Sequence, residues 1–106
     1  MPANQAASRR RGTAYLLIRH KVANYRKWNR VFSDSRQMRK ASGSKGGDLF
    51  RSAHEPRELV IVLRWKTVDD ARQFAASDDF KEAMARAGVS DMPDVYLLEK
   101  MGTIAR

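Results

Sequence analysis

The sequence predicts an α+β fold with the ferredoxin-like order β-α-β-β-α-β and an antiparallel four-stranded sheet. Three observations predict it. Runs of alternating apolar residues indicate strands near both ends and in the middle of the chain. Apolar residues at helical spacing fill the two segments between these strands, and Gly- or Pro-containing stretches separate the elements. In this order the first and third strands lie in the middle of the sheet.

The first strand is expected over residues 14–22, where His20 shares parity with Leu16 and therefore faces the helices. Asn24 is a good helix N-cap, and apolar residues recur behind it at helical spacing. An amphipathic helix is therefore expected from Asn24 to about Ala41. The Gly-rich stretch that follows should end this helix.

The second and third strands are expected over residues 48–54 and 58–65, joined by a turn around Pro56. Thr67 and Asp70 form a capping-box pattern that starts the next helix directly after the third strand.

Ser77 has the pattern of a second N-cap, because two aspartates follow it, so this helix is expected to break and restart there. Gly88 should end it. The last strand is expected after Pro93, in the stretch DVYLLEKM.

The third strand is apolar on both faces: one face carries Leu59, Ile61, Leu63 and Trp65, and the other carries Val60 and Val62. A sheet with helices on one side needs only one apolar face, so the second face requires a cover. No further element of the chain can supply it, whereas a second copy packed sheet against sheet can. We therefore predict a homodimer through the sheet faces.

The chain of 106 residues is long enough for one domain with its own core. Residues 1–13, which include three consecutive arginines, lack periodicity and acidic residues and are expected to form a flexible basic arm. Residues 14–106 are expected to form the folded domain. The absence of Cys excludes disulfides and thiolate chemistry and fits a reducing compartment. With no secretion signal and no run of membrane-spanning length, we expect a cytoplasmic protein without membrane contact.

The net charge of +9 favours contact with polyanions, although most of the charges are scattered. RNA-recognition domains share the predicted order of strands and helices, and they need exposed aromatic residues on a central strand. The third strand here, ELVIVLRW, is aliphatic on both faces. We therefore expect no specific nucleic-acid binding, while loose electrostatic contact through the arm stays open.

Metal and nucleophile chemistry lack a recognisable set of residues. His20 and His54 are 34 positions apart without clustered carboxylates, and the sequence has no P-loop pattern or arguable Ser-His-Asp arrangement. His54 lies beside Glu55 in a predicted turn, where a solvated side chain is expected. We expect no metal and no bound cofactor.

The candidate site residues on the first and third strands face the helices. His20 is either a hydrogen-bonded core residue or a general base, because its reference pKa lies near neutrality. Trp65 either fills the core or lines a pocket. Antiparallel pairing should place these two residues near opposite ends of the sheet, so direct contact between them is not expected.

A stripe of aromatic and methionine side chains accompanies them: Trp28, Phe32, Met38, Phe74, Phe80 and Met84. The stripe is either core or pocket lining, and Trp28, Phe74 and Met84 are the members we nominate for a pocket. The ligand that such a lining suits is small, flat and apolar or aromatic. Tyr96, on the last strand, either donates a hydrogen bond to a ligand or anchors the dimer. Arg19 and Arg64 share the face opposite the helices, where they either pair with acids or bind an anion.

The stretches YLLIRHKVANYRKWNRVF, LRWKTVDDARQF, SDDFKEAMARAGV and PDVYLLEK resemble the dimeric α/β-barrel superfamily, which contains antibiotic-biosynthesis monooxygenases, haem-degrading monooxygenases, muconolactone isomerases and cyclase-like proteins. They span residues 15–100. The resemblance implies two ferredoxin-like subunits that join their sheets into a barrel. It also implies a small-molecule cleft between each sheet and its own helices.

In the haem-degrading branch this cleft carries a Trp at the end of the third strand, a His on the following helix and an Asn on the first strand. Trp65 matches the Trp, but Met84 stands where the His would fall and the first strand has no Asn. Haem degradation is therefore not expected. The resemblance leaves a cofactor-free monooxygenase or a cyclase/isomerase acting on an aromatic or polyketide-like substrate, or a non-catalytic ligand-binding or stress-responsive dimer.

Overall fold

The computed structural model describes residues 14–89 and 92–106. Its strands are β1 (Ala14–Lys21), β2 (Ser44–Arg51), β3 (Glu58–Trp65) and β4 (Asp94–Glu99), and its helices are α2 (Tyr25–Asp34), α3 (Arg36–Ala41), α4 (Val68–Ala76) and α5 (Asp78–Arg86). The strands form one antiparallel sheet in the order β2-β3-β1-β4. The predicted ferredoxin-like fold, with the first and third strands in the middle, is confirmed. The basic arm predicted over residues 1–13 lies outside the described residues.

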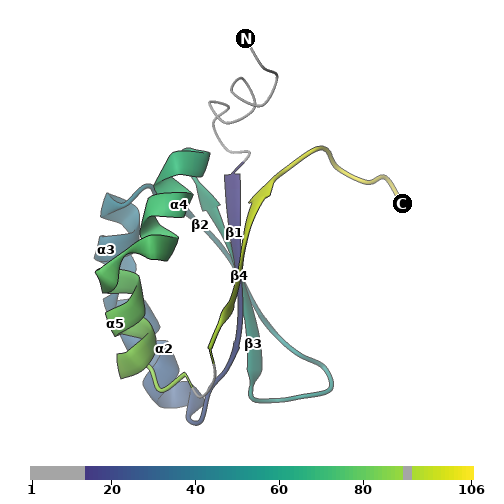
Figure 1. The fold of residues 1–106 in the computed structure, drawn as a ribbon. Coiled ribbons are helices and arrows are strands. Elements are labelled where there is room, and N and C mark those ends of the chain that lie inside the picture. Colours follow the sequence, from purple (N-terminus) through teal and green to yellow (C-terminus); the bar gives the residue numbers. More distant parts are fainter. Residues whose placement is uncertain (1–13, 90–91) are drawn as a thin grey trace.

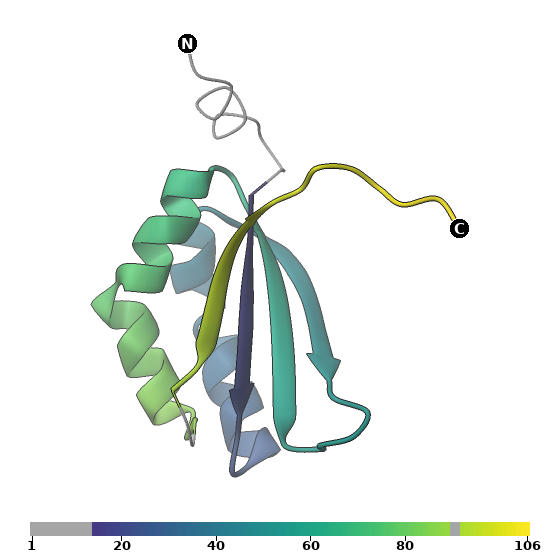
Figure 2. The ribbon, with the colours of Figure 1, turned by 45° about the vertical axis from the view of Figure 1, so that its right-hand side comes forward.

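All the helices cover the same face of the sheet (Figure 1). A view turned by 45° shows that no helix of the described chain covers the other face (Figure 2). The core lies between the helices and the covered face, where the buried strand residues alternate as predicted: Ala14, Leu16, Ile18 and His20 on β1, and Leu59, Ile61, Leu63 and Trp65 on β3. None of the helices in the described part of the chain is long and apolar enough to span a membrane.

Asn24 and Thr67 begin helices where the sequence predicts N-caps. The side-chain oxygen of Asn24 accepts a hydrogen bond from the backbone N–H of Lys27 at 3.1 Å. The hydroxyl of Thr67 accepts from the N–H of Asp70 at 3.0 Å, so α4 starts directly after β3. Each bond satisfies a backbone donor that has no partner inside its helix.

The helix predicted from Asn24 to about Ala41 is interrupted at Ser35, which separates α2 from α3. The Ser35 hydroxyl donates to the carbonyl oxygen of Val31 at 2.8 Å, and its backbone has φ −85° and ψ 4°. A hydroxyl that bonds back to a carbonyl of the preceding turn competes with the helical ladder and bends the helix. The prediction of one continuous helix was therefore wrong at this residue.

The second strand also starts earlier than predicted, at Ser44 rather than Asp48, and it ends at Arg51. Its register with β3 shifts between Ser44 and Gly47, and Gly46 has a positive φ of 90°. The Gly-rich stretch expected to be a loop is therefore the irregular first half of an edge strand. A bulge with a glycine in the left-handed region is a common way to bend such a strand.

The uncovered side of the sheet, which we call the open face, is rich in apolar residues. From the strand registers it carries Tyr15 and Leu17 of β1, Val60 and Val62 of β3, Phe50 of β2, and Tyr96 and Leu98 of β4. Phe50 and Tyr96 are each 53% exposed. Arg19 lies at one end of this face and forms ion pairs with Glu58 and Asp94 of its own chain.

Candidate functional site

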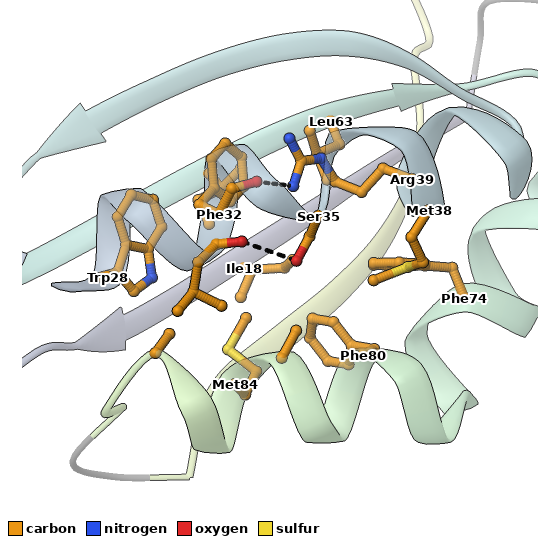
Figure 3. Close-up of a pocket in the computed structure, with 14 residues that line it drawn as sticks. Ile18, Trp28, Phe32, Ser35, Met38, Arg39, Leu63, Phe74, Phe80 and Met84 are labelled. Carbon is orange, nitrogen blue, oxygen red and sulfur yellow. Dashed lines mark hydrogen bonds between the residues drawn. The ribbon is translucent and has the colours of Figure 1, made fainter.

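An apolar cleft lies between the helices and the covered face of β1 and β3 (Figure 3). It contains about 390 Å³ of empty space, including the part that opens to solvent. The residues that line it are Ile18, Trp28, Val31, Phe32, Ser35, Met38, Arg39, Ile61, Leu63, Phe74, Phe80, Ala83, Met84 and Ala87. Facing side chains approach closely, so a bound ring would displace flexible residues such as Met38 and Met84.

One wall of the cleft is a stack of aromatic rings on α2. Trp28 and Phe32 are four residues apart, and their ring centroids lie 4.8 Å apart with an interplanar angle of 11°. Tyr25 stacks on the other side of Trp28 at 5.9 Å. The spacing of three and four residues places the three rings on one side of the helix. Trp28 and Phe32, the two rings that line the cleft, therefore form one continuous apolar wall.

The opposite wall comes from α4 and α5. Ser77 separates these helices, because its hydroxyl donates to the Phe74 carbonyl at 2.7 Å and accepts from the N–H of Phe80 at 3.1 Å. The break brings the rings of Phe74 and Phe80 within 5.1 Å of each other. Met84 lies one turn after Phe80 and also lines the cleft.

The only polar side chains in the lining, among the described residues, are Ser35 and Arg39. The hydroxyl of Ser35 is engaged by the carbonyl of Val31. Arg39 lies over the ring of Phe32 at 3.8 Å and donates from Nη1 to the Phe32 carbonyl at 2.6 Å, and Figure 3 shows it reaching back along the helix to that residue. Burial, and then the neighbouring charge of Arg36, lower the pKa of the Arg39 guanidinium, which remains charged at neutral pH.

Three of the nominated pocket residues, Trp28, Phe74 and Met84, line this cleft together. Trp65 does not. It is completely buried at the far end of β3, where its ring packs against Phe74 at 4.8 Å, and its indole N–H has no partner in the described structure. Trp65 therefore supports a lining residue from behind and is not itself among the residues that line this cleft.

His20 is also buried outside the lining. It is 3% exposed, and its ring lies 5.7 Å from that of Trp28. Neither ring nitrogen has a hydrogen-bond partner in the described structure, and burial lowers the pKa of His20 to about 4. A neutral imidazole behind Trp28 is not placed to take a proton from a molecule in the cleft. It pairs with Leu59, whereas Trp65 pairs with Ala14, so the two candidates lie near opposite ends of the sheet as predicted.

Tyr96 lies on the open face, directly opposite Leu17 on β1. The sheet separates Tyr96 from this cleft, and Tyr96 is not among the lining residues.

Sequence reasoning missed Arg39 as a cleft residue. The available signal was its spacing, since Arg39 follows Phe32 by seven residues, which is two helical turns. In the part of the chain that the structure describes, no group of three His, Asp or Glu side chains is placed to hold a metal ion.

A family model described as antibiotic biosynthesis monooxygenase matches residues 17–86, which is more than half of the chain. No protein of the curated set matches the chain in sequence.

Among solved structures, a protein named as an antibiotic biosynthesis monooxygenase from Bordetella bronchiseptica is similar with a TM-score of 0.70, 24% identity and coverage of 85% of this chain and 98% of that one. A protein of the same description from Caulobacter crescentus CB15 has a TM-score of 0.67 at 22% identity, covering 87% and 92%.

SnoaB, a cofactor-independent oxygenase from Streptomyces nogalater, has a TM-score of 0.71 at 15% identity and covers 90% of this chain and 99% of its own. At these identities the similarity of the structures concerns the fold. The family model is what assigns the chain, which belongs to the antibiotic biosynthesis monooxygenase family.

Proposed function

We propose that this protein binds a flat, electron-rich aromatic molecule in the apolar cleft and oxidises it with O₂ without a bound cofactor. The observation that carries the proposal is the lining of the cleft, in which stacked aromatic rings on α2 face Phe74, Phe80 and Met84 across a narrow space. Apolar, aromatic-lined clefts of this kind suit flat organic ligands. The family of the chain and the shared fold of a cofactor-independent oxygenase support the same chemistry.

In such a reaction the substrate supplies the electrons. It loses two hydrogens and gains one oxygen atom from O₂, while the second oxygen atom leaves as water. The protein supplies a water-poor site and holds the ring in place. Because no imidazole or carboxylate occurs among the described lining residues, the substrate must ionise through its own acidity. The pH dependence of the rate should then follow the pKa of the substrate's hydroxyl group.

The same observation weighs against a cyclase or isomerase step. Those reactions move a proton to or from carbon, and they use a positioned general acid or base. His20, the base that the sequence suggests, is buried behind Trp28 with its pKa lowered to about 4. Oxygenation of an already acidic phenol or hydroquinone requires no such group.

The test is O₂ uptake with dihydroxynaphthalenes as substrates, with ¹⁸O₂ used to label the product. We expect catalysed uptake, one labelled oxygen atom in the product and no effect of chelators. Ala83→Phe, which fills the cleft, should abolish the activity, whereas Ala85→Phe, at an exposed position of the same helix, should retain it. Uptake that is equal in both variants would contradict a reaction in the cleft.

A second candidate function is ligand binding without turnover. The observation in its favour is that Ser35 and Arg39, the polar members of the described lining, are both hydrogen-bonded to α2 carbonyls. If aromatic ligands raise the melting temperature of the wild type but not of Ala83→Phe, and no substrate consumes O₂, the protein is a binding protein.

We also propose that the protein is a homodimer joined through the open face. Leu17, Val60 and Val62 make the centre of this face apolar, and Phe50 and Tyr96 extend it to both edges. An apolar face of this extent on a sheet is normally covered. The segment after β4 carries Met101 and Ile104, which are 97% and 95% exposed, and it runs away from the sheet (Figure 2). A second copy would cover these residues as well.

A further inference from the structure

Two further hollows adjoin the apolar cleft at the β2 edge of the sheet. The first, which we call the edge passage, shares Phe32, Arg39, Ile61 and Leu63 with the cleft and is bordered by Gly46 and Gly47. The second, which we call the basic groove, is lined by Arg36, Arg39, Lys40, Ser44, Lys45 and Gly46. Arg39 is the only residue of the described chain that lines all three spaces, so it marks the point where they meet.

The edge passage is bordered by two consecutive glycines at the irregular part of β2. Gly46 has a φ of +90°, a conformation that disfavours other residues, and there is open space where its side chain would be. At Gly47 a Cβ atom would lie 1.9 Å from the carbonyl oxygen of Val62, so only glycine fits. Gly46 lines both the edge passage and the basic groove, and Arg39 lines both of them and the cleft.

The cations that line the basic groove have no acidic partner among the described residues. Within residues 14–89 and 92–106, none of the four cations that line the basic groove forms an ion pair. Among the described residues, Asp48 is the only carboxylate that lines either hollow, and it makes no ion pair with Arg39.

Arg39 is the cation best placed to bind an anion. It is half-buried, and its position over Phe32 and its bond to the Phe32 carbonyl fix the guanidinium at the mouth of the cleft. A guanidinium has five donors in a planar fork, and the Phe32 carbonyl accepts from only one of its nitrogens. A partly desolvated cation whose remaining donors lack a partner is unfavourable, and an oxyanion would compensate it by charge-assisted hydrogen bonds.

We propose that the ligand of the cleft carries an anionic group, a carboxylate or a phosphate, which Arg39 holds where the cleft meets the basic groove. The apolar part of the ligand lies in the cleft beside Trp28 and Phe32, and the oxyanion lies at Arg39, on the side of the basic groove. Arg39 then determines specificity, because it favours anionic over neutral aromatic ligands. This inference rests on the proposed binding of an aromatic molecule in the cleft, and it names the class to which that molecule belongs.

Two fluorescent probes of nearly the same shape test the proposal: 1-anilinonaphthalene-8-sulfonate, which is an anion, and N-phenyl-1-naphthylamine, which is neutral. The wild type should bind the anion more tightly. Arg39→Gln should weaken binding of the anionic probe by about tenfold, the size expected for one charge-assisted pair. The affinity for the neutral probe should not change. Arg39→Lys should keep part of the preference. Arg30→Gln, which removes an exposed charge from α2 outside all three hollows, is the matched control and should change neither affinity.

A measurement on the wild type alone covers the case in which Arg39→Gln fails to fold. Added salt should weaken binding of the anionic probe and not of the neutral one. Displacement by 2-naphthoate and by 1-naphthyl phosphate, with 2-naphthol as the neutral reference, then distinguishes a carboxylate from a phosphate. If neither displaces the anionic probe better than 2-naphthol does, the proposal is overturned.

The possible failures are distinguishable. Equal binding of both probes, or an equal effect of Arg39→Gln and Arg30→Gln, overturns the role of Arg39 and leaves the cleft intact. If neither probe binds, the cleft is not a ligand site, and this inference is overturned with it. Binding that persists in Ala83→Phe places the probes elsewhere on the molecule and also counts against both.

Discussion

His20 shows how much a single residue's depth can change its chemistry. The sequence predicts its direction correctly, because parity with Leu16 places it on the covered face. Parity does not give the distance to solvent or to the nearest polar atom. In the structure the imidazole is buried against Trp28 without a hydrogen bond to either nitrogen, so its charged form is strongly disfavoured. A residue that reads as a base in the sequence is thus a neutral part of the core.

We expect this histidine to make stability depend on pH. The pKa of His20 is about 4 in the folded protein, against about 6.5 in the unfolded chain, so the unfolded chain binds the proton first as the pH falls. The free energy of unfolding should fall as the pH drops below about 6.5 and should level off below about pH 4. The total loss should be about 3 kcal/mol. Urea unfolding across this range would measure it. His20→Leu should remove this component, and an unchanged pH dependence in that variant would show that other groups cause it.

Some of the predicted pocket residues line the cleft and others do not, for a physical reason. Trp28, Phe74 and Met84 line the cleft because each belongs to a helical stripe that faces the sheet. Trp65 and Tyr96 were chosen from their positions on strands, and strand position gives a face but not the course of a cavity. Trp65 is behind Phe74, and Tyr96 is on the other side of the sheet.

At the scale of elements, Ser77 and Ser35 both separate helices, yet only the first break was predictable. Ser77 precedes two aspartates, and an N-cap followed by acidic residues is a strong helix start. Ser35 precedes Arg36, makes no side-chain cap bond and instead bonds back to Val31. Serine inside a helical pattern gives no signal that distinguishes this bond from a solvated hydroxyl.

Ser77→Ala should destabilise the protein by about 1 kcal/mol, the usual value for an N-cap, because it leaves the N–H of Phe80 without its acceptor. The loss of the bond to the Phe74 carbonyl acts in the same direction. Ser33→Ala, at an exposed position within α2, is the control and should change stability little. The free energies of unfolding in urea give the comparison. Equal effects of the two substitutions would mean that the cap contributes nothing.

The sequence predicts a break over the first half of β2, because Gly-rich stretches interrupt regular elements. Pairing with β3 overrides this preference, since Gly47 and Asp48 pair with Leu63 and Val62. The conformational preference of a segment on its own does not show that a neighbouring strand, here β3, offers it hydrogen-bond partners. Elements with strong periodicity were therefore predictable, and this one was not.

At the scale of the whole molecule, the sequence predicts the topology and the open face. Both follow from the order of elements and from the double apolar pattern of β3, which are properties of the chain itself. The shape of the cleft depends instead on side-chain conformations and on the break at Ser35, so the sequence yields the character of its lining but not its extent.

Leu17→Glu should convert the dimer to a monomer, because it places a charge at the centre of the open face. Light scattering coupled to size exclusion should report about 24 kDa for the wild type, twice the chain mass of 12.1 kDa, and the chain mass for the variant. Gln73→Glu, at an exposed position of α4, adds the same single negative charge and should remain dimeric. A wild type that elutes at the chain mass would contradict the proposed assembly.

The two central strands serve both sides of the sheet with alternate residues, so that Ile18 borders the cleft while its neighbour Leu17 belongs to the open face. Substitutions can therefore alter one side and spare the other. A single-residue deletion within β1 or β3 cannot, because it would exchange inward and outward residues along the rest of the strand. We conclude that these strands evolve under a fixed length, and that variation in length among related chains should be confined to the turns and the terminal segments.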